Sequence, residues 1–105
     1  GANVQPFEVE LVLADCVGVR ESGVVGLPSD RWGEMVVAAV RLREDAGHWT
    51  DERVRAWCGE RLSRHKVPKR VVVMDVLPRT PAGKVDKVAV RAHLARVLTA
   101  AGGTR

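Results

Sequence analysis

The stretch Met35-Val36-Val37-Ala38-Ala39-Val40 is an unbroken run of six apolar residues. A strand with one wet face would alternate apolar and polar residues, whereas a continuous apolar run is typical of a strand buried on both faces. We therefore predict a strand over residues 34–42 and place it at the centre of a sheet. A sheet whose central strand is buried needs helices to cover it.

Two further strands are predicted before and after this run. Residues 19–26 alternate well enough for a strand, and residues 27–30, Leu-Pro-Ser-Asp, are predicted to form a turn into the central strand. Residues 70–77 give the third strand, because they contain Val71-Val72-Val73-Met74. A lysine-bearing loop follows this strand, and Val85 is predicted to begin a short return strand.

Three helices are predicted from apolar spacing and capping residues. The first covers residues 6–14, because Pro6 suits the first helical position. The second covers residues 50–63 with Thr50 as its N-cap, and the third covers residues 87–100 with Asp86 as its N-cap. The expected fold is α+β: one small domain over residues 1–105, with a central three-stranded sheet flanked by helices and a short lysine-bearing hairpin.

Composition narrows the class of protein. The chain has 105 residues, 46% hydrophobic and 29% charged, which fits one small soluble domain with a cytoplasmic location. A net charge of +4 suits anionic partners such as nucleotides and phosphates. Three Trp and one Phe are too few for the aromatic and basic interleaving of a nucleic-acid groove, so we predict no nucleic-acid partner. No apolar run approaches a membrane span.

Cysteines and histidines give no sign of a metal site. Cys16 and Cys58 are isolated and lack CxxC spacing, so we expect free thiols. His48 and His93 show no ligand-like spacing to other histidine, cysteine or acidic residues. We predict no metal held by the chain.

The segment Leu77-Pro78-Arg79-Thr80-Pro81-Ala82-Gly83-Lys84-Val85-Asp86-Lys87 carries the strongest functional signal. Proline fixes φ and glycine permits positive φ, so Lys84 is presented on a stiff, tightly turned tip. A cation held in this way can be aimed at an anion. A bare Gly-Lys pair in a surface hairpin would more often be a solvated lysine.

Four segments, in order, resemble the C-terminal domain of the adenylate-forming ligases, the superfamily of acyl-CoA synthetases, nonribosomal-peptide adenylation domains and luciferases. The lysine segment is the last of the four. The others are Gly1-x-Asn3-Val4-x-Pro6-x-Glu8-Val9-Glu10, Gly26-Leu27-Pro28-Ser29-Asp30-Arg31-Trp32-Gly33-Glu34 and His65-Lys66-Val67-Pro68-Lys69.

The resemblance implies a role for the lysine loop. In the family, the lysine of this motif serves the step that joins a carboxylic acid to the α-phosphate of ATP, so Lys84 is the expected catalytic residue. Arg79, Thr80 and Gly83 are expected to support the loop around it. Lys87 is interpreted as a helix-start residue.

The resemblance also implies contacts with coenzyme A. Gly1 would let the backbone approach the pantetheine arm, Trp32 would contact the nucleotide, and the residues at His65 and Lys69 would flank the nucleotide and phosphates. Some members carry arginine at the position of Val67, so a phosphate donor is missing here. The alternatives are a core or rim tryptophan, a solvated cationic helix end and, for Gly1, a cloning remnant.

The expected whole is the mobile C-terminal lid of a two-domain ligase. Its partners would be an N-terminal adenylation domain of the same polypeptide, ATP and AMP, Mg²⁺ held mainly by that domain, a carboxylic acid and CoA. The lid alone is not expected to be active. Two alternatives stay open: the lid of a domain that loads a carrier protein, and a free-standing module whose Lys84 is acetylated by a protein acetyltransferase.

Overall fold

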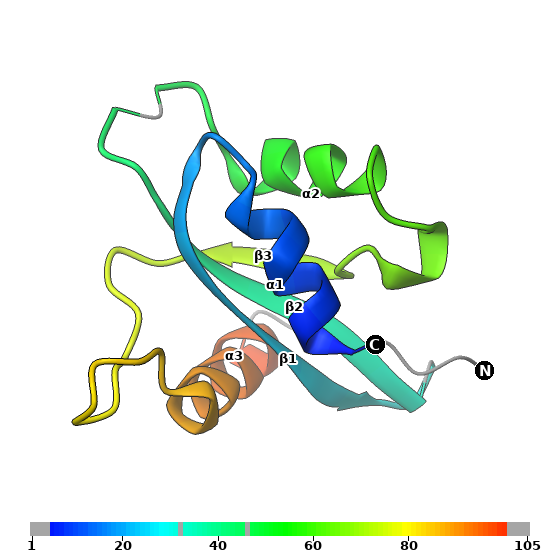
Figure 1. Ribbon diagram of the computed structural model, residues 1–105. Coiled ribbons are helices and arrows are strands. Elements are labelled where there is room, and N and C mark those ends of the chain that lie inside the picture. The colour runs from blue at the N-terminus through cyan, green and yellow to red at the C-terminus, as the bar shows by residue number, and fades with distance from the viewer. Residues whose placement is uncertain (1–4, 32, 46, 101–105) are drawn as a thin grey trace.

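The computed structural model describes residues 5–31, 33–45 and 47–100; Gly1 and Trp32, both expected in the CoA site, lie outside the described residues. Figure 1 shows how helices and strands follow one another along the chain. The elements are α1 (Pro6–Ala14), β1 (Val19–Ser29), β2 (Gly33–Leu42), α2 (Asp51–Gly59), a 3₁₀ turn η1 (Arg64–Lys66), β3 (Arg70–Val73) and α3 (Lys87–Ala100).

The sheet has the order β1-β2-β3 and is mixed, because β1 pairs with β2 antiparallel and β2 pairs with β3 parallel. Val25 lies opposite Val37 in the first pair, and Val40 lies opposite Val73 in the second. Every residue from Met35 to Val40 is buried, so the prediction of a central strand is confirmed. The α+β class, with helices flanking a three-stranded sheet, is also confirmed.

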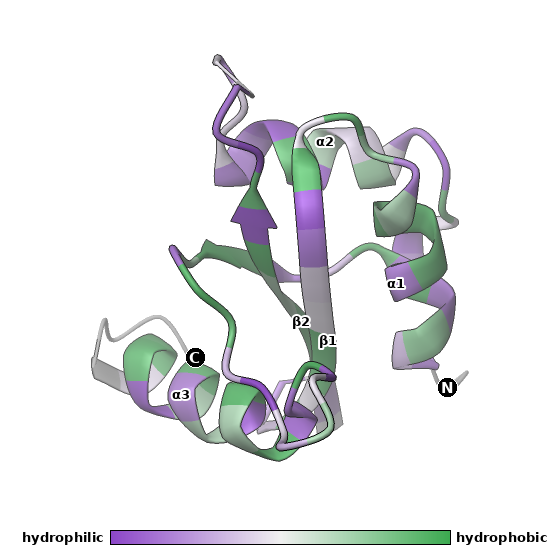
Figure 2. Ribbon diagram, turned by 60° about the vertical axis from the view of Figure 1, so that its left-hand side comes forward, coloured by the Kyte–Doolittle hydropathy of each residue, from purple (hydrophilic) through white to green (hydrophobic). Residues whose placement is uncertain are grey.

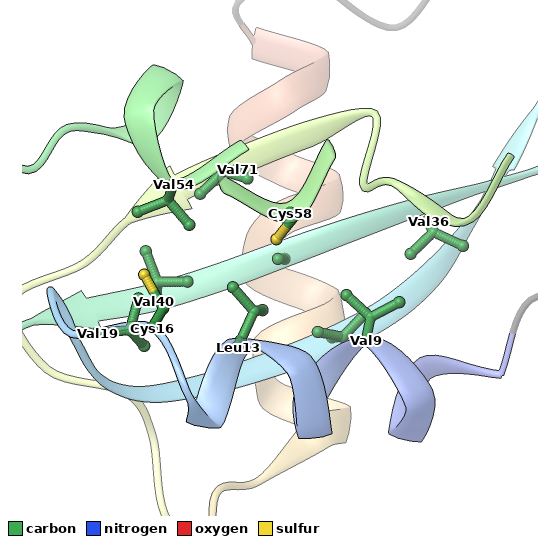
Figure 3. Packing of buried hydrophobic residues seen from close by; sticks show 11 residues of the cluster. Val9, Leu13, Cys16, Val19, Val36, Val40, Val54, Cys58 and Val71 are labelled. Atoms are coloured by element: carbon green, nitrogen blue, oxygen red, sulfur yellow. The ribbon is translucent and has the colours of Figure 1, made fainter. Parts of the chain in front are cut away.

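Alternate residues of β2 serve two hydrophobic clusters, one on each face of the sheet. Val36, Ala38 and Val40 join the cluster under α1 and α2 (the α1/α2 cluster; Figure 3), which is completed by Val9, Leu13, Cys16, Val19, Val24, Val54, Cys58 and Val71. Met35, Val37 and Ala39 join the cluster under α3 (the α3 cluster), with Val25, Leu27, Leu77, Val90, Leu94 and Leu98. Figure 2 shows α1 and α3 on opposite sides of the strands.

Strand β1 is longer than predicted. It runs to Ser29, with Leu27 opposite Met35 and Pro28 opposite Glu34, so the expected turn over residues 27–30 is wrong for residues 27–29. Pro28 is tolerated because β1 lies at the edge of the sheet, where a missing N–H need not break a ladder. Leu27 is buried in the α3 cluster, and this burial favours the extension.

Helix α2 and strand β3 are shorter than predicted. The helix ends at Gly59 rather than Ser63, a point where glycine lowers helix propensity, and the chain then turns so that Leu62 and Val67 pack on the α1/α2 cluster. The strand ends at Val73 rather than at Leu77. Leu77 instead crosses to the other face of the sheet, where it is buried under α3.

The predicted helix caps are confirmed. The Thr50 hydroxyl accepts a hydrogen bond from the Arg53 N–H at 3.1 Å, and the Asp86 carboxylate accepts one from the Ala89 N–H at 3.1 Å. Cys16 and Cys58 are free and buried. Among the described residues, no helix is both long enough and apolar enough to span a bilayer.

Candidate functional site

The lysine segment folds as a tight hairpin. Arg79 and Val85 form an isolated antiparallel bridge, so the predicted short return strand is reduced to this single pair. Inside it, the Thr80 N–H donates to the Lys84 carbonyl at 2.8 Å, and the Gly83 N–H donates to the Thr80 carbonyl at 2.8 Å. Gly83 has φ +86°, a conformation that a side chain would make costly, so glycine is required directly before Lys84.

Side chains also brace this hairpin. The Thr80 hydroxyl accepts a hydrogen bond from the Lys84 N–H at 3.3 Å, and the Arg79 guanidinium donates to the Gly83 carbonyl at 2.8 Å. The same guanidinium forms an ion pair with Glu21 of β1, and the other Glu21 oxygen lies 3.5 Å from Arg41 of β2. The hairpin is therefore fastened to the sheet.

The base of the hairpin is tied to α3 and α1. The Asp86 N–H donates to the Pro78 carbonyl at 2.8 Å, and Val85 packs on the α3 cluster. Lys87, the first residue of α3, lies with its ammonium 2.5 Å from the Glu10 carboxylate of α1. The same Glu10 oxygen accepts a hydrogen bond from the Val24 N–H of β1 at 2.8 Å.

Lys84 differs from its charged neighbours. Of the three cations between positions 79 and 87, Arg79 and Lys87 each have a carboxylate partner. The Lys84 side chain is exposed, and its ammonium has no ion pair within the part of the chain that the structure describes. The arrangement presents one unneutralised cation on a braced tip, which can bind or stabilise an anion that arrives from outside.

The basic segment after α2 is arranged differently. His65 lies exposed in η1, and the Lys69 N–H donates to the Val36 carbonyl of β2 at 2.8 Å. The Lys66 ammonium lies 2.9 Å from the Glu8 carboxylate of α1, and this hydrogen bond and charge hold the pKa of Glu8 below its ordinary value. Val67 is partly buried against the α1/α2 cluster, so its apolar side chain has a packing role.

The structure does not bring Lys84 together with His65 and Lys69. Val85 beside Lys84 packs on the α3 face of the sheet, whereas Val67 between the two basic residues packs on the α1/α2 face. In Figure 1 the yellow-to-orange hairpin before α3 and the green turn after α2 lie at opposite ends of the molecule. The candidate residues thus form two separate groups.

Sequence reasoning missed the two carboxylates that hold the hairpin. In the sequence, Glu10 fits an acidic residue near the start of a helix, where it complements the macrodipole, and Glu21 lies in a predicted strand outside any motif. Glu21 and Arg79 are 58 positions apart, so no local spacing links them. Glu21 lies between Arg20 and Ser22, so a charge at this position does not signal a tertiary contact.

Comparison with known proteins identifies the family. The family described as "AMP-binding enzyme C-terminal domain" matches residues 8–84, which is most of the chain and includes Lys84. The chain belongs to this family. The resemblance drawn from the four sequence segments is therefore confirmed at the level of the family.

Curated relatives of this AMP-binding C-terminal domain are CoA ligases. The chain is 40% identical over 91 residues to the long-chain-fatty-acid–CoA ligase FadD13 of Mycobacterium tuberculosis, covering 87% of this chain and 18% of that protein. It is 44% identical over 100 residues to indoleacetate–CoA ligase of Aromatoleum aromaticum, covering 91% of this chain and 19% of that protein.

Solved structures agree with the fold. A fatty acyl CoA synthetase of M. tuberculosis superimposes with a TM-score of 0.82 at 36% identity, over 92% of this chain and 19% of that one. ATP-bound MatB from Rhodopseudomonas palustris gives a TM-score of 0.84 at 33% identity, over the same shares of the two chains. The chain therefore spans less than a fifth of the length of these relatives.

Proposed function

We propose that this domain is the C-terminal lid of an ATP-dependent acyl-CoA ligase and that Lys84 is its adenylation residue. The observation that carries the proposal is the exposed Lys84 ammonium, which has no ion pair among the described residues, on a hairpin whose other cations are neutralised. Membership in the AMP-binding C-terminal domain family and similarity to named CoA ligases support it.

The chemistry of adenylation fits a positioned ammonium. A carboxylate oxygen of the acid attacks the α-phosphorus of ATP, the bond to the bridging oxygen breaks, and pyrophosphate leaves. Negative charge gathers around the phosphorus and the leaving group, and a fixed cation stabilises that charge more in the transition state than before it. The nucleotide and Mg²⁺ would be held mainly by the rest of the ligase.

The second half-reaction would use the other group of residues. The thiol of CoA attacks the acyl-adenylate and AMP leaves. Trp32, His65 and Lys69 are the proposed contacts of the CoA nucleotide and phosphates, and Gly1 is the proposed neighbour of the pantetheine arm. Because the basic segment after α2 and the Lys84 hairpin lie at opposite ends of the molecule (Figure 1), a rigid lid could present one group at a time by rotating. Domain motion of this kind is a known way to gate two steps.

The acceptor of the acyl group depends on the basic segment after α2 and not on Lys84. Val67 supplies no hydrogen-bond donor to a CoA phosphate in the basic segment. A carrier-protein thiol in place of CoA is therefore the alternative acceptor. The solved relatives also include an amide bond synthetase, McbA of Marinactinospora thermotolerans, at 42% identity and a TM-score of 0.78. A thiol and an amine would attack the same acyl-adenylate, so Lys84 would keep its role with either acceptor.

The exposed ammonium also fits a regulatory reading in which a protein acetyltransferase modifies Lys84 and removes its charge. Mass spectrometry after incubation with such an enzyme and acetyl-CoA would detect the product. Absence of a mass shift at Lys84 would count against this reading.

The half-reactions of the complete ligase test the main proposal. Lys84→Ala should lower pyrophosphate release by about a hundredfold or more, because a preorganised charge is lost. It should leave thioester formation from supplied acyl-adenylate near the wild-type rate. Lys69→Ala is the reciprocal control, since it should slow thioester formation with CoA and leave adenylation unchanged. Equal loss of both steps in Lys84→Ala would refute the role of Lys84.

A further inference from the structure

Two carboxylates from outside the hairpin grip the residues on either side of Lys84. Glu21 of β1 pairs with Arg79, which lies on the first arm of the hairpin. Glu10 of α1 pairs with Lys87, which follows the second arm. The two acids belong to different elements, and neither is near the lysine motif in sequence.

We propose that Glu21 and Glu10 are positioning residues for Lys84 in adenylation. The inference rests on the proposed function of Lys84 and extends it to residues far from the motif. Neither acid would touch a substrate. Each would act by fixing the backbone that carries the lysine and by neutralising a competing cation beside it.

The link from Glu21 reaches the peptide that precedes Lys84. One terminal nitrogen of Arg79 pairs with Glu21, and the other donates to the Gly83 carbonyl at 2.8 Å. The planar guanidinium makes this a stiff bridge from the sheet to the tip of the hairpin. The Glu21 side chain is only 14% exposed, so water screens its pairing less than that of an open surface pair.

The link from Glu10 fixes the other arm. One oxygen of Glu10 accepts a hydrogen bond from the Val24 N–H at 2.8 Å and lies 2.5 Å from the Lys87 ammonium. The Glu10 side chain is 23% exposed. Lys87 starts α3 three residues after Lys84, so this contact sets where the helix begins relative to β1 and hence where the second arm ends.

The pairings also shape the charge at the tip. With Arg79 and Lys87 neutralised, Lys84 carries the remaining positive charge of residues 79–87. Freed from its carboxylate, Arg79 or Lys87 could bind an incoming phosphate in a wrong position. The carboxylates would therefore contribute to selectivity for one binding pose as well as to rigidity.

Glutamine substitutions in the complete ligase test this proposal, because Glu21→Gln and Glu10→Gln keep the size and an acceptor oxygen while they remove the charge. Each variant should lower pyrophosphate release about tenfold or more, since a displacement near 1 Å of a catalytic group can cost a hundredfold. Thioester formation from supplied acyl-adenylate should change less than about twofold on the same reasoning. In a Lys84→Ala background, neither substitution should cause a further loss.

Hydrogen exchange provides a readout that does not depend on activity. Glu21→Gln should speed amide exchange in the peptide that contains Thr80, Gly83 and Lys84, whose N–H groups close the hairpin. Exchange in the central strand, over residues 35–40, should stay unchanged. Glu44→Gln is the matched control, because Glu44 is exposed in the loop between β2 and α2 and should change neither readout.

Three outcomes would overturn the proposal: unchanged adenylation, equal loss of both half-reactions, or faster exchange throughout the sheet. The last two would mean that the acids only stabilise the fold. If Lys84→Ala itself leaves adenylation unchanged, the proposed function fails. In that case hydrogen exchange alone tests whether the two acids hold the hairpin. An unchanged exchange rate of the hairpin amides in the glutamine variants would show that they do not.

Discussion

Replacing Gly23 with a larger residue should push the Lys84 hairpin away from the sheet, because the new side chain would lie under the hairpin. Gly23 lies buried in β1 beneath the hairpin base, where an added Cβ would stand 3.2 Å from Val85 Cγ1 and 3.5 Å from Val90 Cγ2. An alanine therefore needs shifts of only a few tenths of an ångström. A valine places two further carbons about 1.5 Å beyond that Cβ, where they overlap these side chains.

The expected cost grows with side-chain size. Overpacking a close-packed core costs about 1–3 kcal/mol, and replacing glycine in a strand returns up to about 1 kcal/mol. We expect Gly23→Ala to stay within about 1 kcal/mol of wild type and Gly23→Val to lose about 2 kcal/mol. For a domain of this size, that loss corresponds to roughly 10 °C in Tm.

Urea and thermal unfolding of the 105-residue chain measure these values. Val85→Ala should recover part of the loss when it is combined with Gly23→Val, with a coupling energy of about 1 kcal/mol, because it removes the clashing methyl groups. Gly59→Ala, at the end of α2, is the control and should be neutral or stabilising, because an added Cβ there would meet no described atom within 4 Å outside its own helix backbone and chain neighbours. The reasoning is wrong if Gly23→Val is as stable as Gly23→Ala, or if Val85→Ala gives no recovery.

Two further predictions concern the cap of α3 and the buried thiols. Asp86→Ala should cost about 1 kcal/mol in thermal unfolding, because the Ala89 N–H loses its acceptor, whereas Asp86→Asn should retain most of the stability; equal loss in both would contradict a capping role. Burial raises the pKa of Cys58 to about 11 and also raises that of Cys16. Because the unfolded thiols ionise first, stability should fall as the pH rises from about 9 towards 11. At pH 8 a disulfide reagent should modify these thiols only after unfolding, and fast reaction of the folded protein would refute this.

The parts of the fold that depend on local sequence could be predicted. The apolar run from Met35 to Val40 marks the central strand because burial on both faces leaves no place for polar residues. Thr50 and Asp86 mark helix starts because a cap is a contact between near neighbours in the chain. The hairpin around Gly83 follows from its proline and glycine residues in the same way.

The parts of the fold that depend on tertiary context could not be predicted from the sequence. Pro28 looked like a turn residue, and only the edge position of β1 makes it acceptable in a strand. Leu77 looked like the end of a strand, but it is buried under α3 on the other face of the sheet. The pairs Glu21–Arg79 and Glu10–Lys87 join residues more than fifty positions apart, and opposite charges that far apart carry no signal of contact.

Four residues of the lysine motif each have a separate physical task in the hairpin. Gly83 supplies the positive φ, Thr80 and Arg79 close the turn from within, and Asp86 ties its base to α3. These contacts are internal, so Lys84 is left as the group that faces outward. Val85 adds apolar packing over Gly23 of β1, but the charged contacts that hold the hairpin come from Glu21 and Glu10, which lie outside the motif. A chain that kept the motif but lost these carboxylates would carry the same lysine on a looser hairpin, so the motif alone would not be sufficient for efficient adenylation.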